Sequence, residues 1–227
     1  MKQLWNDIVN LFYPRLCILC SRPLIKGEEQ ICLHCLARLP YIRYESQQRV
    51  DSWFAGKSEI QYARAYLHYE KGSSVQRLIH DLKYHGNKEL AYLLGRWAFL
   101  RLQAEQSPLC QAEILLPIPL HPKKKRQRGY NQAEWIAKGI ASVLSIPIDT
   151  TSVVRQVKTD TQTRRHIYER WTNMEEVFTL ISDEALKGKR VLLVDDVLTT
   201  GATFNSCASV VDGIAEIRLM AFALAQV

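Results

Sequence analysis

Apolar and polar residues follow two different patterns along the chain. Between residues 60 and 100, a Tyr- and Ala-rich stretch predicts a strand, and apolar residues three or four apart predict helices near Val75 and Leu90. From Glu113 onward, short apolar runs alternate with longer helical stretches, a pattern typical of β-α-β units and a parallel sheet. This part predicts strands near 114–118, 146–148, 153–157, 177–180, 191–194 and 217–223, and helices near 131–144 and 203–211.

The predicted fold class is therefore α/β, with a parallel sheet flanked by helices. We expect residues 1–57 to form an N-terminal helix and a small cysteine-rich module, and residues 58–227 to form the sheet domain, because residues 40–57 are polar and suit a connector. No stretch approaches the roughly 18 consecutive apolar residues of a membrane helix. Residues 1–14 also make a poor secretory signal, so we expect a cytoplasmic protein without stable membrane insertion.

Composition narrows the class of protein further. The chain has 227 residues, of which 47% are hydrophobic and 23% charged, which fits a folded globular protein and excludes disordered or collagen-like chains. Its net charge of +7 is compatible with nucleic acid, a phosphorylated ligand or an anionic membrane surface. Much of the excess positive charge lies within six residues: Lys123, Lys124, Lys125, Arg126 and Arg128. Such a run is either a binding segment or an ordinary solvated face.

Four of the six cysteines form two Cys-x-x-Cys pairs: Cys17 with Cys20, and Cys32 with Cys35. Such pairs let two thiolates of one turn face the same cation, and a second pair completes a tetrahedral zinc site closed to water. Two disulfides or buried free thiols are the alternatives, although a reducing cytosol disfavours disulfides. His34 is a substitute ligand, but four thiolates already satisfy the metal. The pattern predicts a structural zinc ribbon.

The most informative segment is 191–203, where a buried strand runs into Asp195 and Asp196, then a loop of small residues, then a helix. At the carboxyl end of a parallel strand, backbone N–H groups of such a loop and the helix dipole favour an anion. The carboxylates suit hydroxyl groups or a metal instead. The combination predicts a sugar phosphate, with the acids on ribose hydroxyls and the 5′-phosphate held by Thr199, Thr200, Gly201, Ala202 and Thr203.

Three other interpretations of this segment are weaker. A Walker loop needs Gly-x-x-x-x-Gly-Lys-Ser/Thr, which is absent. A phosphatase of the haloacid dehalogenase type would resemble Asp-x-Asp-x-Thr, whereas these aspartates are adjacent. An ordinary Asp turn with a Thr cap explains each part separately but not their order.

Residues 191–203 resemble the phosphoribosyl pyrophosphate signature of type I phosphoribosyltransferases. The whole chain resembles the ComF family of competence-associated, phosphoribosyltransferase-like proteins. Besides the cysteine pairs and this signature, the resemblance rests on an apolar N-terminus ending in Pro14, Leu82-Lys83-Tyr84-x-Gly86, Pro117-Ile118-Pro119-Leu120, Arg126-x-Arg128-Gly129-Tyr130-Asn131-Gln132-Ala133, Gln162-Thr163 and Arg170-x-x-Asn173.

The resemblance implies a phosphoribosyltransferase-like fold that binds phosphoribosyl pyrophosphate with Mg²⁺. Asp195 and Asp196 would hold the ribose 2′ and 3′ hydroxyls, and Arg126 and Arg128 would neutralise the diphosphate or contact DNA. Residues 158–173 lie where related transferases carry a mobile catalytic loop. There, Lys158 and Arg164, beside Arg165, would offer positive charge to the leaving pyrophosphate.

Two functions stay open at this stage. One is a phosphoribosyltransferase, or at least a protein that binds phosphoribosyl pyrophosphate or a nucleotide. The other, implied by the family's association with DNA uptake and transformation, is a non-catalytic adaptor that binds single-stranded DNA through the basic run and docks a competence helicase through the zinc ribbon. Tyr130 and Trp135 would then stack on bases, although helical spacing with Ile136 and Ile140 favours a core position for Trp135.

Overall fold

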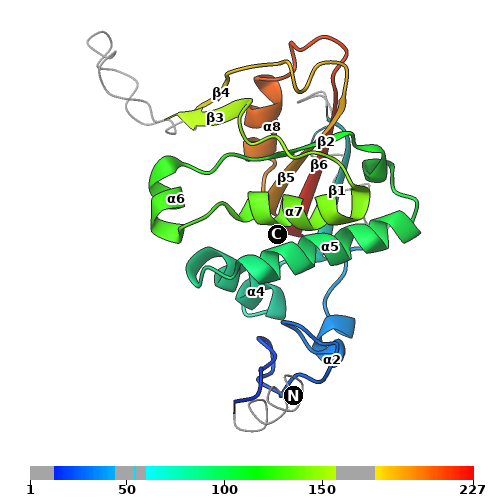
Figure 1. Cartoon of the computed structure of the whole chain (residues 1–227), viewed down its shortest axis with the longest axis vertical. Coiled ribbons are helices and arrows are strands. Elements are labelled where there is room, and N and C mark those ends of the chain that lie inside the picture. The colour runs from blue at the N-terminus through cyan, green and yellow to red at the C-terminus, as the bar shows by residue number, and fades with distance from the viewer. Residues whose placement is uncertain (1–12, 44–53, 55–59, 157–176) are drawn as a thin grey trace, which may run out of the picture.

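A four-stranded parallel sheet forms the centre of the protein (Figure 1). The computed structural model describes residues 13–43, 54, 60–156 and 177–227. The strands of this sheet lie in the order β1 (Ile60–His68), β6 (Arg218–Gln226), β5 (Arg190–Leu198) and β2 (Ile114–Pro117). All three pairings are parallel, which confirms the predicted parallel sheet.

Helices cover both faces of the sheet. The described helices are α2 (Leu33–Ala37), α4 (Ser74–Tyr84), α5 (Lys88–Ala104), α6 (Pro122–Arg128), α7 (Gln132–Leu144) and α8 (Ala202–Ser209), with a 3-10 turn at Pro108–Gln111. Because side chains alternate along a strand, Leu192 and Val194 of β5 pack with α4, α5 and α7, whereas Val191 and Leu193 pack with α8. The sheet thus separates two hydrophobic cores.

Two predicted strands lie outside the parallel sheet. β3 (Val153–Gln156) and β4 (Val177–Leu180) pair with each other in an antiparallel, two-stranded ribbon. The expected strand at 146–148 is reduced to a single parallel bridge between Ile148 and Leu115. Short apolar runs in this region therefore indicated where β3 and β4 form, but not the partner of each strand.

Helices α5 and α7 cross in close contact, side by side in Figure 1. A Cβ atom at Gly95 would overlap the carbonyl oxygen of Ile136, and one at Gly139 would overlap the carbonyl oxygen of Tyr92. Glycine on both helices lets the two backbones approach more closely than any larger residue would allow. This crossing fixes the helical layer on the face of the sheet that carries α4.

The cysteine-rich module packs directly against that helical layer. Cys17, Leu19, Ile31 and Cys32 belong to the same buried cluster as the apolar residues of α4 and α5. Arg77 of α4 donates a hydrogen bond of 2.9 Å to the carbonyl oxygen of Leu19. The predicted α/β fold, with a small four-cysteine module ahead of the sheet, is confirmed.

No helix in the described ranges is long and apolar enough to cross a membrane. The proposed division between residues 1–57 and 58–227 falls among residues 55–59, which are outside the described part of the chain.

Candidate functional site

The acid pair lies inside β5 rather than after it, since the strand continues to Leu198. Adjacent residues of a strand point to opposite faces. Asp196 lies on the face of α4, where its Oδ2 atom is 3.3 Å from the Nζ atom of Lys83. Asp195 interacts electrostatically with Arg155 of β3 and with the Cys207 thiol of α8, which pack against the other face. The strand therefore presents one carboxylate to each layer.

Protein surrounds the Asp195 carboxyl on most sides, although part of its surface reaches solvent. Burial and the negative charge of Asp196 raise the pKa of Asp195 to about 7. The Asp196 backbone N–H, which donates a 2.8 Å hydrogen bond to Asp195 Oδ1, and the cations Lys83 and Arg155 act in the opposite direction. Asp195 thus changes charge near neutral pH, which is the behaviour of a functional carboxyl more often than of a surface one.

The loop after β5 joins the strand to α8. Gly201 has a φ of +76°, a left-handed conformation that glycine adopts without strain, and it caps α8 without a side-chain hydrogen bond. Thr199, Thr200 and Ala202 are exposed, and the predicted order of strand, acids, small-residue loop and helix is present. The N–H groups at the start of α8 and the exposed threonine hydroxyls are donors of the kind that an anion needs.

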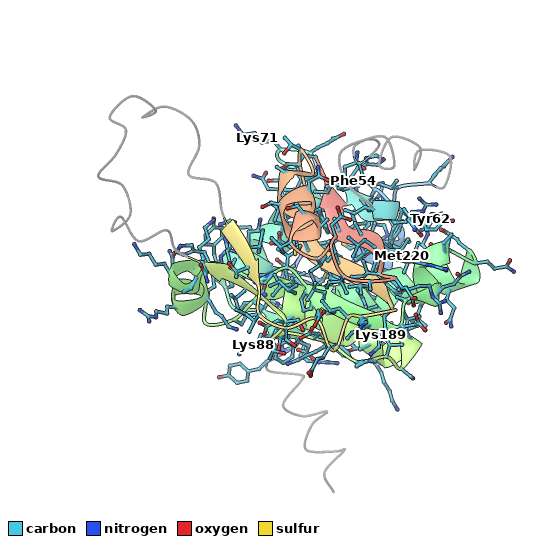
Figure 2. The ribbon with its side chains drawn as sticks, turned by 90° about the horizontal axis from the view of Figure 1, so that it is seen from above. Phe54, Tyr62, Lys71, Lys88, Lys189 and Met220 are labelled. Atoms are coloured by element: carbon cyan, nitrogen blue, oxygen red, sulfur yellow. The ribbon has the colours of Figure 1, made fainter. Side chains whose placement is uncertain are left out.

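Phe54 packs against Gly201 of this loop and against Phe204 of α8. Its ring lies 6.0 Å from that of Phe204 in an edge-on arrangement, and a Cβ atom at Gly201 would be 3.3 Å from it. Figure 2 shows Phe54 beside α8. Sequence reasoning missed this contact, because Phe54 lies in a polar stretch that predicts only a connector.

Lys83 is a second residue that sequence reasoning left without a role. It belongs to the Leu82-Lys83-Tyr84-x-Gly86 motif, so the motif was visible, but nothing in the spacing places it at the acid pair. Lys83 also lines a cavity of about 370 Å³ between α4 and the carboxyl ends of the central strands. The remaining lining residues are Tyr69, Gln76, Ile79, His80, Tyr84, Val197, Thr199 and Val227.

The basic run forms the exposed helix α6. Arg128 donates a 3.0 Å hydrogen bond to the side chain of Gln132, and its guanidinium carbon is 6.0 Å from the centre of the Tyr84 ring. Lys125 pairs with Glu134 at 3.0 Å. Arg126 is exposed on the same helix. Arg128 therefore lies near Tyr84 at the edge of the cavity, and Arg126 is exposed to solvent on α6.

The two aromatic residues after this helix differ. Tyr130 is buried, its hydroxyl donates to the carbonyl oxygen of Leu82, and burial raises its pKa to about 12. Trp135 is half-buried against the core, with the Nζ atom of Lys138 4.1 Å from its ring centre. Both positions favour the core interpretation over a stacking platform for DNA.

The four predicted thiols lie together. The Sγ atoms of Cys17, Cys20, Cys32 and Cys35 are all within 4.8 Å of one another. A tetrahedral zinc site with bonds of about 2.3 Å requires sulfur atoms about 3.8 Å apart, and those of Cys20 and Cys32 are separated by 3.7 Å. The cluster therefore suits a metal ion such as zinc.

The hydrogen bonds of the cluster agree with this interpretation. The Cys32 backbone N–H donates to the Cys17 sulfur at 3.4 Å. Burial opposes ionisation of Cys17, but backbone donors of this kind prevail and lower its pKa to about 7. His34 points instead toward Arg38, whose guanidinium is 3.2 Å from its Nε2 atom, so it is not among the four clustered ligands.

The predicted catalytic cations Lys158 and Arg164, together with Arg165, Gln162-Thr163, Arg170 and Asn173, lie outside the described residues. The signature loop, Lys83 and Arg128 thus make up the described part of the site.

Comparison with known proteins establishes the family. The chain is 31% identical to competence protein F of Haemophilus influenzae over 164 residues, which are 70% of each chain. The chain belongs to the ComF family. It is also 26% identical to the DNA utilization protein YhgH of Escherichia coli over 92% of its own length and 96% of that protein. Competence protein ComFC of Bacillus subtilis is 30% identical over 42% of this chain and 36% of that protein.

Two further comparisons add little to the ComF assignment. No protein-family model matches the chain. Among solved structures, a purine phosphoribosyltransferase of Pyrococcus horikoshii is similar with a TM-score of 0.35 and 18% identity, over 63% of this chain and 75% of that one. A likeness at this level bears on neither the ligand nor the reaction.

Proposed function

We propose that this ComF-family protein binds phosphoribosyl pyrophosphate, together with Mg²⁺, at the carboxyl end of β5. One observation carries the proposal: two residues after the acid pair, β5 ends in the loop 199–203, where Thr199, Thr200 and Ala202 are exposed and α8 begins. Asp195 and Asp196 would accept hydrogen bonds from ribose hydroxyls, and residues 199–203 would donate to the 5′-phosphate.

The described residues also account for the charges of such a ligand. Carboxylate oxygens are ligands that Mg²⁺ prefers, and a bound Mg²⁺ would neutralise part of the diphosphate charge. Lys83 and Arg128 would supply further positive charge beside the acids. Because Lys83 already pairs with Asp196, it would also orient that carboxylate toward the ligand.

Transfer of the phosphoribosyl group would be a separate property. In that reaction the protein stabilises a cationic sugar and a leaving pyrophosphate mainly by fixed charges. We propose Lys158 and Arg164 as the cations for the leaving group, in keeping with their place in the family pattern.

Calorimetric titration with phosphoribosyl pyrophosphate and Mg²⁺ tests the binding proposal. We expect micromolar affinity for the wild type and its loss in the double variant Asp195→Asn, Asp196→Asn, because neutral amides hold neither the metal nor both hydroxyls. Asp212→Asn, which removes an exposed aspartate beyond α8, is the matched control and should bind as the wild type does. Absence of binding by the wild type would refute the proposal.

We propose handling of single-stranded DNA as a second function. Relatives named for competence and DNA utilization support it, as does the exposed basic helix α6. A competence helicase is the partner we would test first at the cysteine module.

Salt dependence tests the DNA function. If Lys123, Lys124 and Arg126 contact phosphates, their joint replacement by alanine should reduce the slope of log affinity against log salt by about 2. A control that replaces the exposed Lys71 and Lys187 should leave the slope unchanged. Equal slopes in both variants would exclude α6 as the DNA-binding surface.

We further propose that the cysteine module holds one structural Zn²⁺ and that the protein works in the cytoplasm, where thiols stay reduced. Four thiolates would complete the coordination of the metal and leave no position for water, so its role would be stability rather than catalysis. Metal analysis of the purified protein should give one zinc per chain.

A further inference from the structure

The cavity between α4 and the carboxyl ends of the strands has aromatic walls. Tyr84 and His80 have ring centres 4.6 Å apart, and Tyr69 lies at the end of β1 on another side of the same cavity. Tyr84 is 62% exposed, so much of its ring is accessible from solvent. Arg128 lies near its ring, at 6.0 Å. A flat, accessible ring of this kind is a surface on which another ring can stack.

Polar groups occur around the same cavity. Gln76, Thr199 and Lys83 are among the residues that line it, and the Gln76 Oε1 atom already accepts a hydrogen bond of 2.5 Å from the Gly72 N–H. These groups can donate or accept hydrogen bonds at the edge of a planar heterocycle. A volume of about 370 Å³ is at the small end of the range for ligand sites. The cavity therefore suits one small ring system rather than a large ligand.

The cavity adjoins the proposed sugar-phosphate site through two of its residues. Thr199 lines the cavity and is also the first residue of the loop expected to hold phosphate. Lys83 lines it and reaches Asp196, the acid expected to hold a ribose hydroxyl. A ligand that filled both places would carry a ring, a sugar and a phosphate next to one another, in the order found in a nucleotide.

We propose that this cavity binds the nucleobase of a ligand whose ribose and 5′-phosphate occupy Asp195, Asp196 and the loop 199–203. The base stacks on Tyr84, and Gln76 and Thr199 contact its edge. This inference rests on the proposed sugar-phosphate site and adds a base-binding part to it, in which residues of helix α4 contact the base.

The test compares ribose 5-phosphate with AMP and UMP, which add a purine or a pyrimidine to the same sugar phosphate. Stacking on an aromatic side chain contributes roughly 1–3 kcal/mol per base, so at least one nucleotide should bind about 10- to 100-fold more tightly than ribose 5-phosphate. In Tyr84→Ala this ratio should fall to within about threefold of unity, whereas Tyr84→Phe should retain it.

Tyr62→Ala is the matched control. Tyr62 is also an exposed tyrosine, at 43%, but it is in register with Met220 near the amino ends of the strands (both labelled in Figure 2) and is not among the residues that line the cavity. It should leave the ratio unchanged. A stacking readout adds independent support: the fluorescence of 2-aminopurine riboside 5′-monophosphate should be quenched by the wild type and by Tyr84→Phe, but not by Tyr84→Ala.

The outcomes separate the two proposals. If ribose 5-phosphate binds but neither nucleotide binds more tightly, the base cavity is refuted and the sugar-phosphate site stands. If ribose 5-phosphate does not bind, the sugar-phosphate site is refuted, and titration with adenosine, which lacks the phosphate, then tests the base cavity alone. Adenosine binding that depends on Tyr84 supports the cavity, and no adenosine binding refutes it as well.

Discussion

Replacement of Asp195 by asparagine should stabilise the folded protein at neutral and alkaline pH. The wild-type carboxyl is buried against Asp196, and its pKa in the folded protein is about 7, compared with 3.8 in the absence of these interactions. Asparagine has nearly the same shape, and its carbonyl oxygen can still accept the 2.8 Å hydrogen bond from the Asp196 N–H. The substitution therefore removes the charge and keeps the packing.

The sign and size of the effect follow from proton linkage. A carboxyl with a raised pKa in the folded state keeps its proton there while the unfolded chain has lost it, so the folded state loses stability as pH rises from about 4 to about 7. A difference of about 3 pKa units corresponds to roughly 4 kcal/mol at pH 8, falling to about half of that at pH 5.5. Above pH 8 the penalty is constant.

Urea unfolding of wild type and Asp195→Asn at pH 5.5 and pH 8 measures this penalty. The free energy of unfolding of the variant should exceed that of the wild type by several kcal/mol at pH 8, and by about 2 kcal/mol less at pH 5.5. Comparison at each pH cancels contributions common to both proteins, including those of bound metal. The exposed Asp212→Asn should show equal differences at both pH values. A variant less stable than the wild type at pH 8 would refute the reasoning.

Three further perturbations test other parts of the structure. Lys83→Met removes a cation that lowers the pKa of Asp195, so the pH midpoint of phosphoribosyl pyrophosphate binding should move upward. A midpoint that stays in place would contradict this role of Lys83. Gly139→Ala forces a methyl group into the backbone of α5 and should cost at least about 1–3 kcal/mol in urea unfolding, whereas Gly213→Ala, which meets open space, should be close to neutral. Cys17→Ser should lower zinc content and melting temperature, whereas Cys110→Ser should retain one zinc per chain; equal metal content in the two variants would argue against the four-thiol site.

Much of the fold was predictable because its signals are local. The apolar run at 191–194 predicted a buried strand, which is part of β5. Apolar residues at helical spacing predicted helices close to α4, α5, α7 and α8. The antiparallel pairing of β3 with β4 was not predictable, since a short apolar run does not specify its partner. The position of β1 beside β6 is likewise set by the packing of distant segments.

The candidate site divides in the same way. The acid pair and loop 199–203 are contiguous in sequence, so their chemistry was visible, and the four thiols follow a fixed spacing. Lys83 and Tyr84 are separated from β5 by more than 100 residues, and only the fold brings α4 to the carboxyl ends of the strands. The sequence could not show that Asp195 and Asp196 face different layers, because the predicted strand ended at residue 194, whereas β5 continues to Leu198 and includes both aspartates.

The hydrophobic core shared by the cysteine module and α4 links the folding of the two parts, and therefore affects how well the protein resists proteolysis in a cell. Leu19 and Ile31 are buried with Leu78 and Leu82 of α4, so loss of the module would uncover the apolar face of the helix that carries Lys83. If the module holds Zn²⁺ as proposed, the free energy of metal binding contributes to folding and, through this shared core, stabilises the sheet domain as well. On that proposal, zinc shortage would expose the whole protein to proteolysis, rather than leave a folded sheet domain that lacks its N-terminal module.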